Sequence, residues 1–267
     1  MEIFGYIAAI FIGISLGLVG SGGSILTVPV LVYLLHVNPL LATTSSLFIV
    51  GTTSLVGGLR ANAKGMLDFK AVTEFGFPSV FSIFITRHYL LPEIPDTINL
   101  SASLSVSKNM LLMVVFAVLM LLASYSMIAN KEDEKNDRLP RPRHERIFPL
   151  MFFGLAIGVI TGLLGAGGGF LIIPTLVLFL GLDMKKAVGT SLMIIAINSL
   201  FGFLFSLKQF HFDWRLLTIF TTLAVAGIFI GAKLSEKISP VALKKGFGWF
   251  ILTMGIYIIT KEIFLRP

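Results

Sequence analysis

Two glycine-rich segments carry the residues whose types and spacing best suit a chemical role. The segment from Gly17 to Pro29 reads Gly-Leu-Val-Gly-Ser-Gly-Gly-Ser-Ile-Leu-Thr-Val-Pro, and that from Gly162 to Pro174 reads Gly-Leu-Leu-Gly-Ala-Gly-Gly-Gly-Phe-Leu-Ile-Ile-Pro. Each glycine destabilises a continuous helix by about 1 kcal/mol, so both segments predict a break followed by a new helix. The first N–H groups of a helix lack internal acceptors and carry partial positive charge. The pattern therefore indicates reversible binding of a small anion.

Close helix packing is the alternative explanation for these glycines. Small residues let helices approach each other, and Gly13 and Gly17 have the four-residue spacing for it. Binding is favoured because the pattern occurs twice, breaks a helix, and opens a segment too short to cross a membrane comfortably. The predicted binding groups are Ser21, Gly22, Gly23 and Ser24 at one junction, and Ala166, Gly167, Gly168 and Gly169 at the other.

Hydroxyl side chains cluster shortly after each junction. Thr43-Thr44-Ser45-Ser46 opens one long apolar segment, Gly189-Thr190-Ser191 opens another, and Asn198 is the only amide deep inside any such segment. Serine and threonine often bond a carbonyl of their own helix instead of a ligand. We nevertheless expect substrate to contact some of these groups. The candidates are Thr44, Ser45, Ser46, Thr190, Ser191 and Asn198.

Few acidic side chains fall within apolar segments. Glu74 lies inside one and is the candidate for proton coupling, although a place at the cytoplasmic interface would also explain it. Asp68 and Asp213 each precede a basic residue by two positions, and we expect loop or gating ion pairs there.

Enzymatic and cofactor-binding patterns are weak in this sequence. The chain has no cysteine, and its four histidines fall near segment ends without metal-binding spacing. The glycine motifs lack the Lys-Ser/Thr that ends a phosphate-binding loop. Basic stripes with interleaved aromatic residues, which would indicate nucleic-acid binding, are also missing. No cofactor, metal or nucleic acid is predicted.

Composition indicates elements that lie in a membrane. The 267 residues have a mean hydropathy of +0.92, with 55% hydrophobic and 13% charged residues. Soluble domains carry about 25% charged residues, so much of this surface must face lipid. Apolar runs reach or approach the ~20 residues that cross a bilayer. The sequence begins without a basic region, so no cleaved signal peptide is expected. The predicted fold class is an all-α polytopic membrane protein.

An internal duplication organises the chain. An offset of 145 residues superposes the two glycine motifs and, without a gap, pairs Ser46 with Ser191 and Asp68 with Asp213. Each copy has five apolar segments, at 3–19, 24–36, 40–60, 69–91 and 104–129, and at 147–164, 169–181, 186–207, 215–233 and 242–262. The predicted organisation is repeat one at 1–129, a charged linker at 130–146, and repeat two at 147–267.

The topology depends on whether the first two segments of each copy return to their starting side or make one broken crossing. If they return, the copies are inverted. One side then holds six basic residues of the linker with Arg60, Lys64, Lys70, Lys185, Lys186, Lys233, Lys237, Lys244 and Lys245, and the other holds Arg87, Lys108, Lys208, Arg215, Lys261 and Arg266. A single crossing divides the charges more evenly, so the positive-inside rule favours inversion. We expect both termini outside and the linker in the cytoplasm.

The doubled Gly-x-x-Gly-x-Gly-Gly with its following proline, the short second segments and the duplicated layout resemble the TauE/SafE family of sulfite-exporter-like permeases. The resemblance covers essentially the whole chain. It implies transport of small anions, chiefly sulfite, sulfonates and related sulfur compounds, across the bacterial inner membrane. Facing helix N-termini ringed by hydroxyls would suit such an anion near the midplane. A passive channel or an accessory membrane subunit is the alternative.

Overall fold

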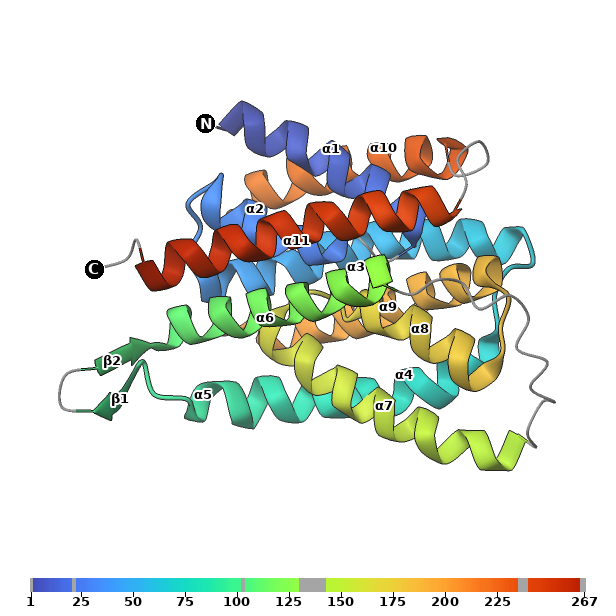
Figure 1. The fold of residues 1–267 in the computed structure, drawn as a ribbon, viewed down its shortest axis with the longest axis horizontal. Coiled ribbons are helices and arrows are strands. Elements are labelled where there is room, and N and C mark those ends of the chain that lie inside the picture. The colour runs from blue at the N-terminus through green and yellow to red at the C-terminus, as the bar shows by residue number, and fades with distance from the viewer. Residues whose placement is uncertain (1, 21–22, 102–103, 130–142, 235–239, 265–267) are drawn as a thin grey trace.

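The computed structural model describes residues 2–20, 23–101, 104–129, 143–234 and 240–264, which are mostly helical (Figure 1). The helices are α1 (Glu2–Val19), α2 (Ser24–Tyr33), α3 (Pro39–Ala63), α4 (Phe69–Ile85), the π-helical turn η1 (Thr86–Leu90), α5 (Leu91–Glu93), α6 (Lys108–Ala129), α7 (Arg143–Leu164), α8 (Gly169–Leu180), α9 (Met184–Ser206), α10 (Trp214–Leu234) and α11 (Pro240–Phe264). Five of them, α3, α6, α7, α9 and α10, are long and apolar enough to cross a membrane. The predicted all-α polytopic class is confirmed.

A short hairpin departs from the predicted segments. Strands β1 (Thr97–Ser101) and β2 (Leu104–Ser107) pair antiparallel, so the fifth predicted segment begins as a strand and its helix starts only at Lys108. Polar and apolar residues alternate through 97–107, which is the period of a strand rather than a helix. The buried Lys108 ammonium donates to the carbonyls of Leu91 and Ile94 and ties α6 to the end of α5.

The first two helices form an antiparallel hairpin that turns at Gly20. A Cβ added to Gly5, near the start of α1, would lie 2.5 Å from Leu35 Cδ2, just beyond α2. At the opposite end of the hairpin, Gly23 approaches the backbone oxygen of Ile12. The 10 residues of α2 span only about 15 Å, about half of a hydrocarbon core. The chain therefore returns toward its starting side, which is one of the two arrangements that the sequence left open.

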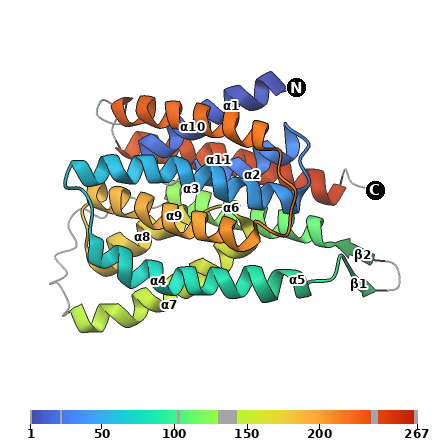
Figure 2. The ribbon, with the colours of Figure 1, turned by 180° about the vertical axis from the view of Figure 1, so that it is seen from behind.

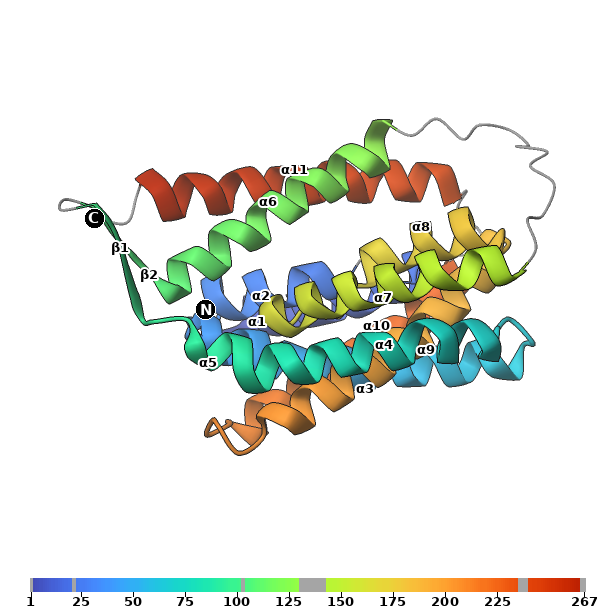
Figure 3. The ribbon, with the colours of Figure 1, turned by 90° about the horizontal axis from the view of Figure 1, so that it is seen from below.

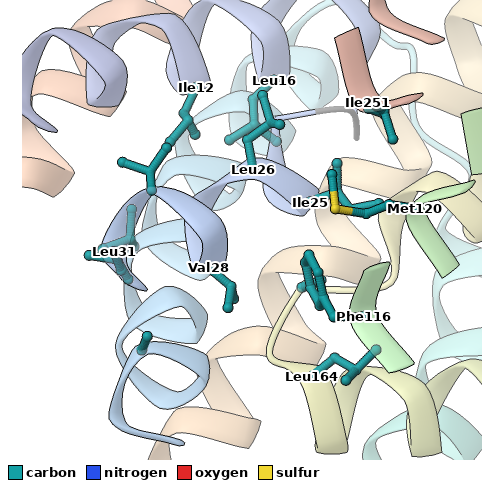
Figure 4. Close-up of a cluster of buried hydrophobic side chains, with 14 of the residues drawn as sticks. Ile12, Leu16, Ile25, Leu26, Val28, Leu31, Phe116, Met120, Leu164 and Ile251 are labelled. Atoms are coloured by element: carbon teal, nitrogen blue, oxygen red, sulfur yellow. The ribbon is translucent and has the colours of Figure 1, made fainter. Parts of the chain in front are cut away.

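Apolar side chains bury α2 inside the protein (Figure 4). The cluster joins Ile12 and Leu16 of α1, Ile25, Leu26, Val28 and Leu31 of α2, Phe116 and Met120 of α6, Leu164 of α7 and Ile251 of α11. Since α2 is covered by protein, its broken start does not expose backbone groups to lipid, which hydrocarbon would not tolerate.

The two halves of the chain interlock. The first helix of each half packs along the fourth helix of the other, α1 on α10 and α7 on α4. The third helices, α3 and α9, pack against each other, as the views from front and behind show (Figures 1 and 2). The fifth helices, α6 and α11, also pair and lie together along one side (Figure 3).

Glycine contacts repeat with the halves exchanged. A Cβ at Gly13 would meet Ala224 O at 2.0 Å, and one at Gly158 would meet Ser79 O at 2.5 Å. The offset of 145 that relates the two glycines also relates Ser79 to Ala224. In the same way, the contact of Gly17 with Gly231 corresponds to that of Gly162 with Thr86. The contacts of Gly57 with Leu192 and Ile228 correspond to those of Gly202 with Leu47 and Ile83. An approximate two-fold axis between the halves would require this reciprocity.

The exterior is apolar, and hydroxyl side chains lie within the otherwise apolar interior. Large apolar side chains such as Phe77 and Phe148 are about four-fifths exposed, at 78% and 80%. Fully buried polar side chains lie on α3, α4 and α9 at the centre, and include Thr44, Ser46, Thr53, Ser54, Ser79, Thr190, Ser191, Asn198 and Ser199. An apolar exterior is what a lipid environment requires, and the buried hydroxyls of the central helices are candidates for substrate contact.

Candidate substrate-binding site

Each glycine junction turns on a left-handed residue pressed against the other half. Gly20 has φ 77° and contacts Val188, while Gly165 has φ 70° and contacts the backbone oxygen of Thr43. Any side chain at these two positions would be strained and would push α1 from α9 or α7 from α3. The predicted site residues Ser21 and Gly22 lie outside the described residues.

The second junction ends in a helix start that no side chain caps. Gly167 and Gly168 both have positive φ, at 67° and 66°, and Gly168 is the N-cap of α8 without a side-chain hydrogen bond. The first two N–H groups of α8, those of Gly169 and Phe170, precede the intrahelical bonds, which begin with Leu171 N to Gly168 O, and they point out of the helix start. Ala166 and Gly169 are buried within the same junction. In the first junction Gly23 is instead right-handed, at φ −65°, and Ser24 is fully buried.

Two hydroxyl groups that the sequence analysis did not select border the second junction. A Cβ at Gly168 would lie 2.5 Å from Thr161 Oγ1, and one at Gly167 would lie 3.1 Å from Ser199 Oγ. Both hydroxyls are buried and have no hydrogen-bond partner among the residues that the structure describes. The offset of 145 pairs Ser199 with Ser54, whose hydroxyl is also buried without a partner, so duplication was the signal that could have selected Ser199.

The predicted hydroxyls of α3 form hydrogen bonds with the second junction and with the guanidinium of Arg87. Ser46 donates to the backbone oxygens of Thr43 and Gly165, the latter at 2.5 Å, which fixes the junction to α3. Thr44 Oγ1 accepts a hydrogen bond of 2.7 Å from Arg87 Nη1. Ser45 is buried, with 6% of its surface exposed.

Structural hydrogen bonds occupy the predicted polar groups of α9. Thr190 Oγ1 accepts from Asp68 N at 3.0 Å, and Ser191 donates to Val188 O within its own helix. Asn198 Nδ2 donates to Ser79 Oγ at 2.7 Å, while Asn198 Oδ1 has no partner in the ranges that the structure describes. Of these three residues, Asn198 therefore retains an open acceptor.

Charged residues differ from their sequence-based interpretation. Arg87, which the charge count placed on the outer side, is fully buried in η1, where it contacts Thr44 of α3 and its neighbour Thr86 packs on Gly162 of α7. Asp68 and Asp213 cap the starts of α4 and α10 through the backbone N–H groups of Ala71 and Leu216. A helix cap replaces the ion pair as the role of each aspartate. Glu74 lies within α4 and is partly buried.

The described side chains of this site are not those of a metal centre. Within the described part of the chain, no three His, Cys, Asp or Glu side chains come together as a candidate metal site. The donors near the second junction are hydroxyls, backbone N–H groups and one guanidinium, which suit an anion rather than a cation.

A family model described as sulfite exporter TauE/SafE matches residues 6–258, nearly the entire chain. The chain belongs to the sulfite exporter TauE/SafE family. Members of this family are membrane transporters rather than enzymes, so this TauE/SafE protein is a multi-pass membrane transporter.

Similar proteins from three bacteria carry the name probable membrane transporter protein. The relative from Xylella fastidiosa strain 9a5c is 24% identical over 258 residues, covering 94% of this TauE/SafE chain and 92% of its own. One from Haemophilus influenzae is 26% identical over 269 residues, covering 93% and 94%. The Bacillus subtilis protein YdhB is 26% identical over 234 residues, covering 87% and 90%. No solved structure gives a significant match.

Proposed function

We propose that this transporter moves a small oxyanion, either sulfite, a sulfonate or a related sulfur compound, through a site at its glycine junctions. The observation that carries the proposal is the start of α8, where an uncapped helix N-terminus meets the unpartnered hydroxyls of Thr161 and Ser199. Buried donors without acceptors are costly, and a bound oxyanion would satisfy several of them together. The family's description as sulfite exporters supports the choice of sulfur oxyanions.

The proposal includes inverted repeats, at 1–129 and 147–267, joined by a cytoplasmic linker at 130–146. Three observations support inversion. The hairpin of α1 and α2 returns to its starting side, and α3 runs antiparallel to its equivalent α9, since later glycines of α3 contact earlier residues of α9. In addition, Thr190 near the start of α9 bonds Asp68 at the start of α4, which places Lys185 and Lys186 at the same end as Lys64. The termini would lie outside a bacterial inner membrane.

Gly167→Ala tests the site. An alanine there would keep φ near 67°, and its Cβ would lie 2.9 Å from Ile195 Cγ2 and 3.1 Å from Ser199 Oγ. Gly181→Ala is the matched control, because Gly181 has φ 65° but no atom within 4 Å of the added Cβ. Both variants bear the same backbone strain of about 1–2 kcal/mol. Purified protein in liposomes should take up labelled sulfite saturably, and only Gly167→Ala should lose about tenfold or more of the initial rate.

Normal uptake by Gly167→Ala, with Gly181→Ala also normal, would contradict the site. Non-saturable flux and an absence of counterflow in the unaltered protein would support the passive channel instead. If no labelled oxyanion moves at all, the proposed substrate class is wrong.

A further inference from the structure

Arg87 is the largest side chain among the described residues that is less than 2% exposed. It lies in the π-helical turn η1, which continues α4 toward the end of the molecule where α1 begins (Figure 1). Burying a guanidinium, which stays charged at any physiological pH, is expensive unless another group compensates the charge. In the interior of a membrane protein such a residue usually serves a substrate or ion.

The compensation within the chain is incomplete. Arg87 Nη1 donates to Thr44 Oγ1 at 2.7 Å, and this neutral hydroxyl is its hydrogen-bond partner among the described residues. Arg87 Nε and Nη2 are both buried, and neither has a partner within the described part of the chain. The N–H groups of Nε and Nη2 point in parallel from one edge of the guanidinium, which is the edge that grips two oxygens of a carboxylate, sulfonate or phosphate.

Neighbouring contacts place this residue beside the second glycine junction. Thr86, adjacent to Arg87, contacts Gly162 at the end of α7. Thr43, adjacent to the hydroxyl that holds Arg87, contacts Gly165 through its backbone oxygen. The guanidinium and the α7–α8 junction therefore meet the same turn of α3, through Thr44 and Thr43 respectively.

The corresponding place in the other half has no charge. The offset of 145 pairs Arg87 with Ala232 and Thr44 with Gly189. Ala232 occupies the equivalent position, because Gly17 contacts its backbone nitrogen. Likewise, Gly20 contacts Val188, the residue before Gly189. Of these two equivalent positions, the one in the first half therefore carries a cationic pair of donors and the one in the second half does not.

We propose that the Nε and Nη2 edge of Arg87 binds two oxygens of the transported oxyanion, while Thr44 holds the guanidinium through Nη1. This inference rests on the proposed function. It makes Arg87 the charge-binding residue and the second junction the primary site. An anionic group, planar or pyramidal, with at least two equivalent oxygens fits this edge. A spherical halide would bind to it less well.

Thermal unfolding of the full-length purified protein measures this binding. The anions are sulfite, methanesulfonate and acetate, titrated against a chloride background of constant ionic strength. For the unaltered protein and for Lys208→Gln, whose lysine is exposed, oxyanions should raise Tm with the same affinity. Arg87→Gln should weaken that affinity by about tenfold or more, since a charge-assisted bidentate pair is lost. Arg87→Lys, which keeps the charge but not the two parallel donors, should fall between them.

The anion-free state separates binding from a structural role. Arg87→Gln removes an incompletely compensated buried charge, so its Tm without anion should equal or exceed that of the unaltered protein. A lower anion-free Tm with unchanged oxyanion affinity would show that Arg87 is structural and overturn the inference. If Arg87→Gln cannot be recovered folded, Thr44→Val decides, because it should weaken oxyanion binding several-fold, and unchanged affinity there contradicts the proposal.

Failure of the inference differs from failure of the proposed function. If sulfite stabilises the unaltered protein and Arg87→Gln equally, the Arg87 assignment is wrong and transport by the glycine junctions stands. If none of the three oxyanions changes Tm and none enters liposomes, both are wrong.

Discussion

Buried hydroxyl groups in this protein divide by what they bond. Thr190 bonds a backbone N–H at the start of α4, and Ser191 bonds a backbone carbonyl within α9. Both are therefore poorly placed to change partners during transport. Thr161 and Ser199 have no partner in the described part of the chain and border the start of α8. Unsatisfied buried donors cost about 1–3 kcal/mol each, a cost that proteins usually accept at functional sites.

Glu74 is a residue-scale candidate for proton coupling. It lies in α4, and the offset of 145 places Ile219 at the matching position, so one half alone carries this carboxylate. We expect Glu74→Gln to remove the dependence of sulfite uptake on an imposed pH gradient while leaving uptake without a gradient. Liposomes with buffered interiors measure both rates. A wild-type gradient response in Glu74→Gln would exclude this role.

Short helices and close contacts define the element scale. The helix breaks before α2 and α8 are tolerated because protein covers them. In each half the first helix packs on the short second helix, and it also packs closely on the fourth helix of the other half, α1 on α10 and α7 on α4. Glycines make this approach possible, since Gly13 and Gly158 each face a backbone carbonyl of the opposite half. Packing is therefore the role of these two glycines, of which the sequence alternative had named Gly13, while the junction glycines supply turns.

Gly158→Val should separate α7 from α4. The added Cβ would lie 2.5 Å from Ser79 O and 2.8 Å from Ser82 Cβ, so we expect a loss of about 2 kcal/mol or more in the free energy of unfolding. Gly76→Ala in α4 is the control, because nothing lies within 4 Å of its Cβ, and it should gain up to about 1 kcal/mol. Chemical denaturation in detergent measures both, and equal effects would contradict the packing account.

At the scale of the whole molecule, α1 begins and α11 ends at one end, where the β1–β2 hairpin also projects (Figure 1). The opposite end holds the α3–α4 loop and the start of α9 with their lysines, joined through Thr190 and Asp68. Positive charge at that end agrees with a cytoplasmic placement by the positive-inside rule.

Side-specific reporters at the two termini and at Asn136 test this topology. We expect both termini outside and Asn136 in the cytoplasm, because inverted copies with an odd number of crossings each place the linker opposite the termini. A linker on the same side as the termini would contradict inversion. Termini in the cytoplasm, with the linker outside, would reverse the orientation but keep the inverted fold.

The sequence by itself determined the membrane class, the duplication and the helix limits to within a few residues. Those features depend on local properties, namely apolar run length, the helix-breaking effect of Gly20 and Gly165, and a pattern that repeats at a fixed offset. The alternation of polar and apolar residues at 97–107 also indicates strands, although an apolar membrane segment was predicted over part of that range.

Tertiary structure alone decided which polar groups are occupied. The charge count placed Arg87 on the outer side, near the end of the fourth predicted segment. Its burial comes from α3 and α7, whose positions relative to η1 no local pattern encodes. Thr190 looked like a ligand because its partner, Asp68, is 122 residues away in sequence. The return of α2 beside α1 depends likewise on contacts such as Gly5 with Leu35. Local chemistry fixes where helices break, whereas long-range packing decides which donors remain for a substrate.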